Sequence, residues 1–211
     1  MTPDRPAGDA FPGRPPRDDR APRGPDAVRR AALDAATDLF ARRGLAAVSV
    51  RRVAAEAGVN PSLVHRYVGG KDDLVRAVLA DLIDQLRGDL GAFAERADQP
   101  LPDRLAEVLA THQRIVAHLV IEGHDIREYQ VEFPVMAHII EEIQRRRGVD
   151  ETTARRRSAL IYAHDLSVRL FMPVLLRAAG LDEPDDRAAL EASVREVNLW
   201  LSELDVADPS A

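Results

Sequence analysis

The sequence predicts an all-α fold of about nine helices, and three observations favour it. Apolar residues recur at spacings of three and four along most of the chain, which is the periodicity of an amphipathic helix. No stretch shows the strict apolar–polar alternation that is typical of a strand. Pro, Gly, Ser, Asn and Asp punctuate the periodic segments where helices begin and end. With 211 residues, 45% of them hydrophobic, the chain is long enough for a sizeable core.

Residues 1–25 precede the first periodic segment. They hold 7 of the 14 prolines, and Phe11 is their only large apolar side chain. Such a segment buries too little apolar surface to offset the entropy of ordering, so we expect a disordered tail. It has no apolar region of the kind found in a secretory signal.

Helical periodicity begins at Asp26, which we predict as the N-cap of a helix that ends before Gly44. Ser49 is the expected N-cap of a second, short helix, which Gly58 ends. Asn60, followed by a proline, predicts a third helix over 61–68.

A double glycine breaks the chain after this third helix, and Lys71 opens a fourth. The remainder is helical throughout, with Pro173 as the expected kink in a long helix. The later predicted segments are 102–121, a short one at 126–131, 134–147, 151–179 and 185–205. Two arginine triplets, 145–147 and 155–157, are flanked by acidic residues and are interpreted as solvated surface.

The net charge of −6 is unevenly distributed. Residues 26–76 carry nine basic and six acidic side chains, whereas residues 77–211 carry 15 basic and 25 acidic ones. This asymmetry predicts a basic domain over 26–76 that binds an anionic partner, joined to an acidic domain over 77–211.

Two short helices joined by a tight turn, braced by a preceding helix in a basic block, predict a helix-turn-helix. The helix from Pro61 would enter the major groove of double-stranded DNA, where base edges are distinguishable. Ser62, Leu63 and Arg66 are the candidates for base contacts. Ser49 and Lys71, each at a helix start, are the candidates for phosphate contacts.

Residues 44–74 read GLAAVSVRRVAAEAGVNPSLVHRYVGGKDDL. This stretch resembles the DNA-binding region of TetR-family transcriptional regulators, and the resemblance covers residues 26–76. It implies a homodimer of nine-helix subunits, whose first three helices bind DNA and whose helices five to nine bind a small effector. By this resemblance Ser49, His65 and Lys71 occupy phosphate-contacting positions, and Pro61 and Ser62 lie near base edges.

The complete predicted DNA-binding set is Ser49, Arg51, Pro61, Ser62, Leu63, His65, Arg66, Tyr67 and Lys71. The chain departs from the family pattern at His65, where the family most often has Tyr, and at Gly69-Gly70, which predicts a weak cap on the fourth helix. For Arg66 a solvated helix face and for Tyr67 a core position stay open as alternatives. Helix capping alone would also explain Ser49 and Lys71.

The acidic domain is interpreted as an effector sensor and a dimerisation unit. We expect its cavity between the helices at 102–121, 134–147 and 151–179, lined by apolar and a few polar groups. The candidates are His112, Tyr129, Phe133, Met136, Tyr162 and His164. His112 has a competing interpretation as a core histidine with local partners.

The last two helices, about 152–179 and 185–205, predict a four-helix interface between two subunits. Asp165 and Arg169 are four residues apart, so they are expected to pair on one helix face. This ion pair either stabilises the helix at the subunit interface or, as the weaker alternative, binds a polar ligand.

Several function classes find no support. Cys 0 excludes thiolate metal sites and disulfides. Because no His has a Glu three positions before it, a di-iron carboxylate enzyme lacks its motif. We therefore expect no catalytic residues, cofactor or metal, no membrane span, and a cytoplasmic location. An all-α enzyme and a helical dimerisation protein without DNA binding remain the alternatives.

Overall fold

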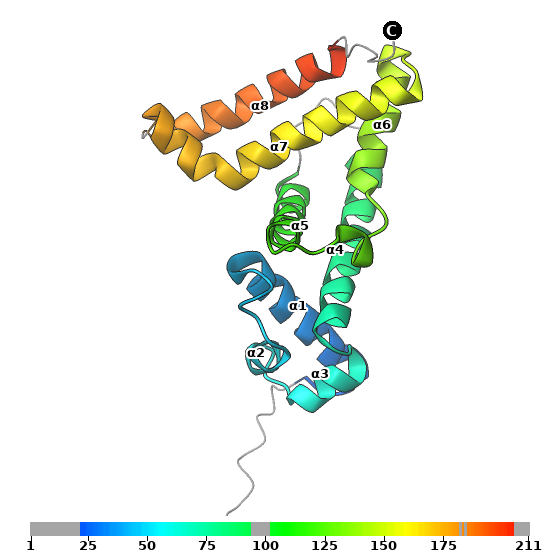
Figure 1. Cartoon of the computed structure of the whole chain (residues 1–211), viewed down its shortest axis with the longest axis vertical. Coiled ribbons are helices and arrows are strands. Elements are labelled where there is room, and N and C mark those ends of the chain that lie inside the picture. Colours follow the sequence, from blue (N-terminus) through cyan, green and yellow to red (C-terminus); the bar gives the residue numbers. More distant parts are fainter. Residues whose placement is uncertain (1–21, 94–101, 182, 184, 205–211) are drawn as a thin grey trace, which may run out of the picture.

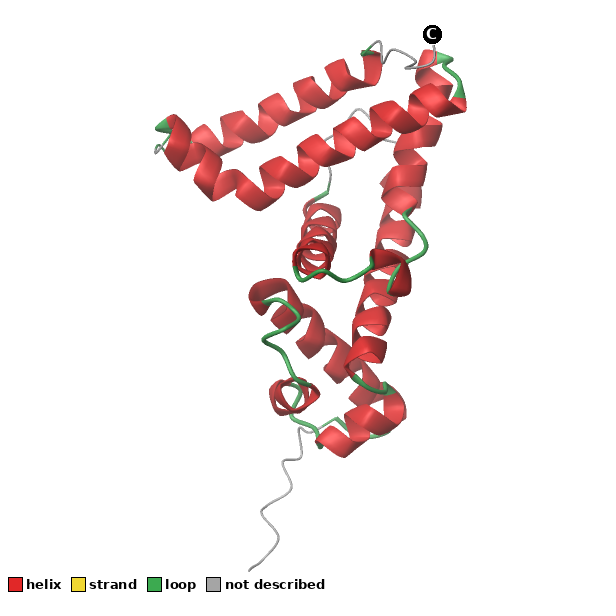
Figure 2. Ribbon diagram, in the orientation of Figure 1, coloured by secondary structure: helices red, strands yellow, loops and turns green. Residues whose placement is uncertain are grey.

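The computed structural model describes residues 22–93, 102–181, 183 and 185–204. Within these ranges the chain is all-α: eight α-helices and one short 3-10 helix, with no strand (Figure 2). The elements are α1 (Pro25–Arg43), α2 (Val50–Glu56), α3 (Pro61–Tyr67), α4 (Lys71–Phe93), α5 (Asp103–Ile121), η2 (Ile126–Glu128), α6 (Pro134–Arg147), α7 (Glu151–Ala179) and α8 (Asp186–Glu203). Residues 1–21 of the predicted tail lie outside the described residues.

Local capping chemistry explains the starts of α2 and α3. The side chains of Ser49 and Asn60 accept hydrogen bonds from backbone N–H groups of α2 and α3, which confirms both predicted N-caps. The prediction for α1 is wrong by two residues, because Gly24 is the N-cap and Asp26 lies in the first turn. Pro25 takes the first helical position instead, where its missing N–H costs nothing and its fixed φ suits the helix.

The helices form three regions along the molecule (Figure 1). The first three helices make a head at one end, and α4 runs from the head into the body. Helix α5 packs on both α1 and α4, while α7 and α8 lie together at the end opposite the head. The long α4 therefore connects the head directly to the body.

The head and the body share one hydrophobic core. The main buried cluster combines residues of α1 to α4 with Ile115 and Leu119, both on α5 and both fully buried. Residue 76, where the charge distribution divides the chain, lies inside α4 between Val75 and Val78, two members of this cluster. The first half of α5 also packs against α4, through Leu105 and Leu109.

The far end has a smaller core. Ile143, Ala154, Ile161 and Leu201 join α6, α7 and α8. Arg157, in the second arginine triplet, is buried rather than solvated: its guanidinium donates to the carbonyl oxygens of Leu204 at 2.8 Å and Ser202 at 2.9 Å. These bonds satisfy carbonyl groups at the C-terminal end of α8.

Among the described residues, α7 is the one helix whose length and composition would let it cross a membrane. Its apolar window is only 11% buried within the chain. Asp165 and Arg169 lie within this helix and pair at 2.8 Å, as predicted. An ion pair at this position would be costly in hydrocarbon.

Candidate DNA-binding surface and its links to the body

The helix-turn-helix is held by local bonds at each junction. Ser49 Oγ accepts the N–H of Arg52 at 3.2 Å at the start of α2. The turn needs Gly58, whose φ of +65° is a left-handed conformation that side chains disfavour. Asn60 Oδ1 then accepts both the N–H of Ser62 at 2.9 Å and its hydroxyl at 2.8 Å. Ser62 Oγ is thereby oriented as an acceptor, which suits an amino group on a base edge.

One buried residue fixes the rotation of α3. Val64 is fully buried against the head core, so the opposite side of the helix faces solvent. Ser62, His65 and Arg66 are exposed on it, whereas Leu63 and Tyr67 are half-buried. The predicted DNA-binding set also includes Ser49 and Pro61. Its last two members are Arg51, exposed on α2, and Lys71, half-buried at the start of α4. The polar face of α3 is therefore available to a groove.

Arg66 and Tyr67 interact with each other. The Arg66 guanidinium lies over the Tyr67 ring, with 5.5 Å between its carbon and the ring centroid. Such a cation–π contact uses the guanidinium face and leaves its N–H donors in the plane. Arg66 can thus stack on Tyr67 and still present the fork that fits the two acceptors of guanine.

The start of α4 is capped more firmly than the double glycine predicts. Asp73 Oδ2 accepts the N–H of Gly70 at 3.0 Å, so a side chain three residues into α4 supplies the cap. The carboxylate also pairs with Arg76 at 3.2 Å. The N–H of Gly70 is thereby bonded to Asp73, and half-buried Lys71 places its ammonium group at the same helix start.

A first contact between head and body follows the end of α5. The Glu122 carboxylate accepts the N–H of Leu45 at 2.9 Å and that of Ala46 at 2.8 Å, in the loop between α1 and α2. A Cβ at Gly44 would lie 2.7 Å from Glu122 Oε1, so glycine permits this close approach. Sequence reasoning missed Glu122, because its partners lie 77 and 76 residues away.

A second contact joins η2 to the first turns of α4. Arg76 Nε donates to the carbonyl of Glu128 at 2.9 Å, and the Arg76 guanidinium lies 5.4 Å from the Tyr129 ring centroid. The Tyr129 hydroxyl donates to Asp72 Oδ1 at 3.3 Å, and its ring meets His124 edge-on. Tyr129, predicted as a pocket residue, therefore lies at the junction between η2 and the start of α4.

The other predicted pocket residues are spread over the body. His112 is buried and its Nε2 lies 2.8 Å from Gln130 Oε1, whereas His164 Nδ1 lies 2.8 Å from Asn198 Oδ1 across α7 and α8. Tyr162 is half-buried, and burial raises the pKa of its hydroxyl. Met136 is half-buried on α6.

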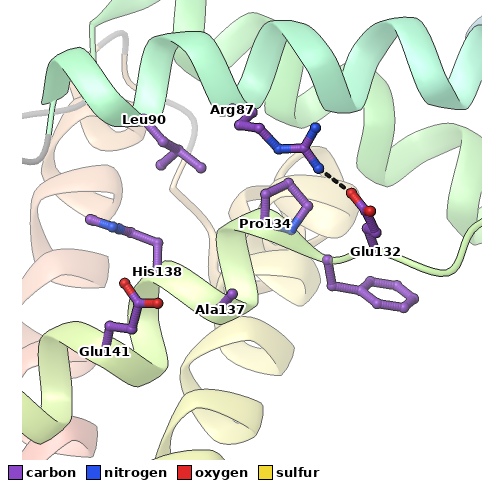
Figure 3. A pocket seen from close by; sticks show the side chains of 8 residues that line it. Arg87, Leu90, Glu132, Pro134, Ala137, His138 and Glu141 are labelled. Carbon is purple, nitrogen blue, oxygen red and sulfur yellow. Dashed lines mark hydrogen bonds and ion pairs between the residues drawn. The ribbon is translucent and has the colours of Figure 1, made fainter.

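A groove of about 450 Å³ opens between α4 and α6. Phe133 is the only one of the six predicted pocket residues in its lining. Arg87 and Glu132 form an ion pair at its edge, and His138 and Glu141 lie along α6 (Figure 3). The structure thus does not bring the six predicted pocket residues together in one cavity: Tyr129 lies at the junction, Phe133 lines the groove, and the other four lie elsewhere in the body.

Comparison with known proteins identifies the family. A model of "Bacterial regulatory proteins, tetR family" matches residues 32–78. The HTH-type transcriptional repressor Rv3405c of Mycobacterium tuberculosis is 39% identical over 164 residues, which are 78% of this chain and 84% of that protein. The chain belongs to the TetR family. As a member of the TetR family it is a DNA-binding transcriptional regulator, and the family is not one of enzymes.

Other relatives match a smaller part or more distantly. The HTH-type transcriptional regulator BetI of Brucella canis is 40% identical over 84 residues, 40% of this TetR-family chain and 42% of BetI. The crystal structure of the multidrug binding protein EbrR complexed with imidazole is 22% identical, covers 87% of this chain and 98% of that one, and has a TM-score of 0.49.

Proposed function

We propose that this TetR-family protein is a repressor that binds a palindromic operator as a homodimer and releases it when a small molecule binds the body. The observation that carries the DNA-binding part is the exposed polar face of α3, which Val64 orients on a net-basic head. The similarity to a relative named as a repressor supports the sign of the regulation.

The homodimer is supported by the exposed apolar side chains of α7 and α8. Large apolar patches on a protein surface commonly mark an interface. Those on these two helices are Leu160 (40% exposed), Phe171 (55%), Val174 (64%), Leu175 (40%), Val197 (38%), Leu199 (58%) and Trp200 (58%). Two copies joined here would form a four-helix interface and could contact half-sites about 34 Å apart.

Effector control is supported by the two contacts between body and head. Glu122 holds the loop before α2. Glu128 and Tyr129 hold the first turns of α4, just after α3, through Arg76 and Asp72. A ligand that shifts α5 or the segment after it would therefore change the position of α3. A small change of this kind removes one half-site from register in a two-fold dimer.

Selection of bound duplexes from a random library tests the proposal. We expect wild-type protein to enrich a palindrome, and light scattering to give the mass of two chains. A double variant, Arg66→Ala with Lys71→Ala, should lose this enrichment. If no sequence is enriched at low salt, the protein is a helical dimerisation protein and the proposal fails. Because a repressor acts on chromosomal DNA, we place it in the cytoplasm.

A further inference from the structure

The tautomer of buried His112 follows from its neighbours. Gln130 Nε2 donates to the carbonyl oxygen of Glu132 at 2.8 Å, and a carbonyl can only accept, so Gln130 Oε1 must face His112. The proton therefore resides on His112 Nε2, which donates to Gln130 Oε1 at 2.8 Å. Burial lowers the pKa of His112, so the ring is neutral and Nδ1 carries a lone pair.

The next residue of α5 presents a second acceptor. Gln113 is fully buried, and its Nε2 donates to Asp165 Oδ2 on α7 at 3.3 Å. This bond fixes the amide orientation, because a carboxylate can only accept. The Gln113 amide N–H also donates to the Tyr162 hydroxyl. Gln113 Oε1 is therefore the free end of the amide.

Both acceptors lack a hydrogen-bond partner within the described part of the chain: His112 Nδ1 and Gln113 Oε1. Buried polar atoms are nearly always paired, because desolvation without a compensating bond costs free energy. Two such atoms on adjacent residues of α5 can each accept a hydrogen bond from a bound molecule. His112 bonds the segment after η2 and Gln113 bonds α7, so both acceptors belong to the part of α5 that packs between these two neighbours.

The chemistry of the two atoms defines what completes them. Each needs a donor, so a carboxylate or phosphate group would face lone pairs and be repelled. A cation would have to be desolvated without a free counter-charge, because the nearby Asp165 carboxylate already pairs with Arg169. The groove between α4 and α6 is different, since its Arg87 and Glu132 are paired and exposed to solvent.

We propose that the effector is a neutral small molecule with N–H or O–H donors, an alcohol or an amide, which bonds His112 Nδ1 and Gln113 Oε1. This inference rests on the proposed effector control and names the class of ligand and its anchoring atoms. A ligand in this place would contact α5, whose end carries the Glu122 contact to the head.

Binding is tested without DNA, by calorimetry on the wild-type protein with matched fragments. Each neutral amide or alcohol is accompanied by its methylated counterpart and by the carboxylate of the same ring, such as benzamide, N,N-dimethylbenzamide and benzoate. We expect a neutral donor to bind, and its methylated and anionic counterparts to bind at least about tenfold more weakly. The ¹⁵N signals of labelled His112 should show a neutral ring protonated at Nε2, and Nδ1 should shift when the donor binds.

Variants separate this place from the groove. Gln113→Leu and His112→Phe should each weaken binding about tenfold, and the melting temperature of ligand-free Gln113→Leu should not fall by more than about 4 °C. His138→Phe, in the groove, should bind as the wild type does. Four results would each overturn the inference. These are a larger fall in the melting temperature of Gln113→Leu, tighter binding of carboxylates, loss of binding only in His138→Phe, and no binding by any fragment.

Release of the selected operator by the same fragments distinguishes the two proposals. If no operator is bound, the proposed function fails, while calorimetry still tests the two acceptors. If the operator is released by compounds that bind Gln113→Leu and wild type equally, only the ligand inference fails.

Discussion

Gly69 holds a backbone conformation that other residues rarely adopt, two residues before the start of α4. Its φ is +115°, and a Cβ there would lie 2.5 Å from Asp73 Oδ2 and 2.8 Å from the Asp73 Cβ. Asp73 occupies that space because its carboxylate caps α4 through Gly70. This glycine and this aspartate together set how α3 leads into α4.

We expect Gly69→Ala to lower the free energy of unfolding by about 1–3 kcal/mol, because the alanine would be strained and would displace Asp73. Thermal melting would show a shift of about 2–4 °C for each kcal/mol in a chain of this size. Gly88→Ala is the matched control inside α4, where nothing lies within 4 Å of the added Cβ. It should raise stability by about 0.5–1 kcal/mol, and a loss equal to that of Gly69→Ala would contradict the argument.

The neutral state of His112 makes stability depend on pH. Burial lowers its pKa from the ordinary 6.5, so the unfolded chain binds the proton more readily. The neutral ring makes its full contribution to the free energy of unfolding above pH 6.5. This contribution is lost as the pH falls toward the pKa of His112 in the folded state. We expect the melting temperature of wild type to fall more between pH 7.5 and 5.5 than that of His112→Phe. Parallel pH profiles would show that His112 does not titrate on unfolding.

At the scale of elements, the loop between α1 and α2 depends on one side chain of the body. We expect Glu122→Ala to lower the free energy of unfolding by about 1–3 kcal/mol, because the N–H groups of Leu45 and Ala46 lose their acceptor. Amide hydrogen exchange should quicken at these two residues. Glu107→Ala, at an exposed position of α5, is the control and should leave that exchange unchanged.

The exposed face of α3 and the start of α4 should affect DNA binding differently. Arg66→Ala should cost about 1–3 kcal/mol at the selected operator and relax specificity at one base pair. Lys71→Ala should weaken binding to all sequences and reduce the salt slope by about 1. Fluorescence anisotropy at several salt concentrations measures both. Equal losses on operator and random duplex for Arg66→Ala would assign it to the phosphates.

Features within one or two helices could be predicted from the sequence, and those between distant segments could not. Ser49 and Asn60 bond N–H groups two or three residues away, so their residue types and positions suffice. Tyr129 depends on Asp72, 57 residues away, and its apolar ring equally suggested a pocket. Arg157 stands in a run of arginines that indicates surface, and only the position of the end of α8 shows why it is buried.

At the scale of the whole molecule, the apolar face of α7 and α8 should determine the assembly. We expect Phe171→Asp to give monomers by light scattering and to weaken operator binding strongly, because one head alone reaches one half-site. Val131→Asp is the matched control: Val131 is 82% exposed but lies outside α7 and α8. A dimeric Phe171→Asp variant would place the interface elsewhere.

The charge division between head and body was visible in the sequence, but the continuity of their core was not. The last turns of α5 complete the core of the first four helices. The helical periodicity of α5 does not predict this, because a single apolar stripe can pack against the head or against the rest of the body. Ile115 and Leu119 belong to the cluster around Phe40 and Val64.

This shared cluster limits how far the protein is modular. A chimera that takes its first four helices from one family member and its remaining helices from another would place foreign side chains where Ile115 and Leu119 fill the core. We therefore expect such a chimera to fold only when the second half of α5 and Glu122 come from the same protein as the first four helices. Operator specificity would then be transplanted together with part of the sensor.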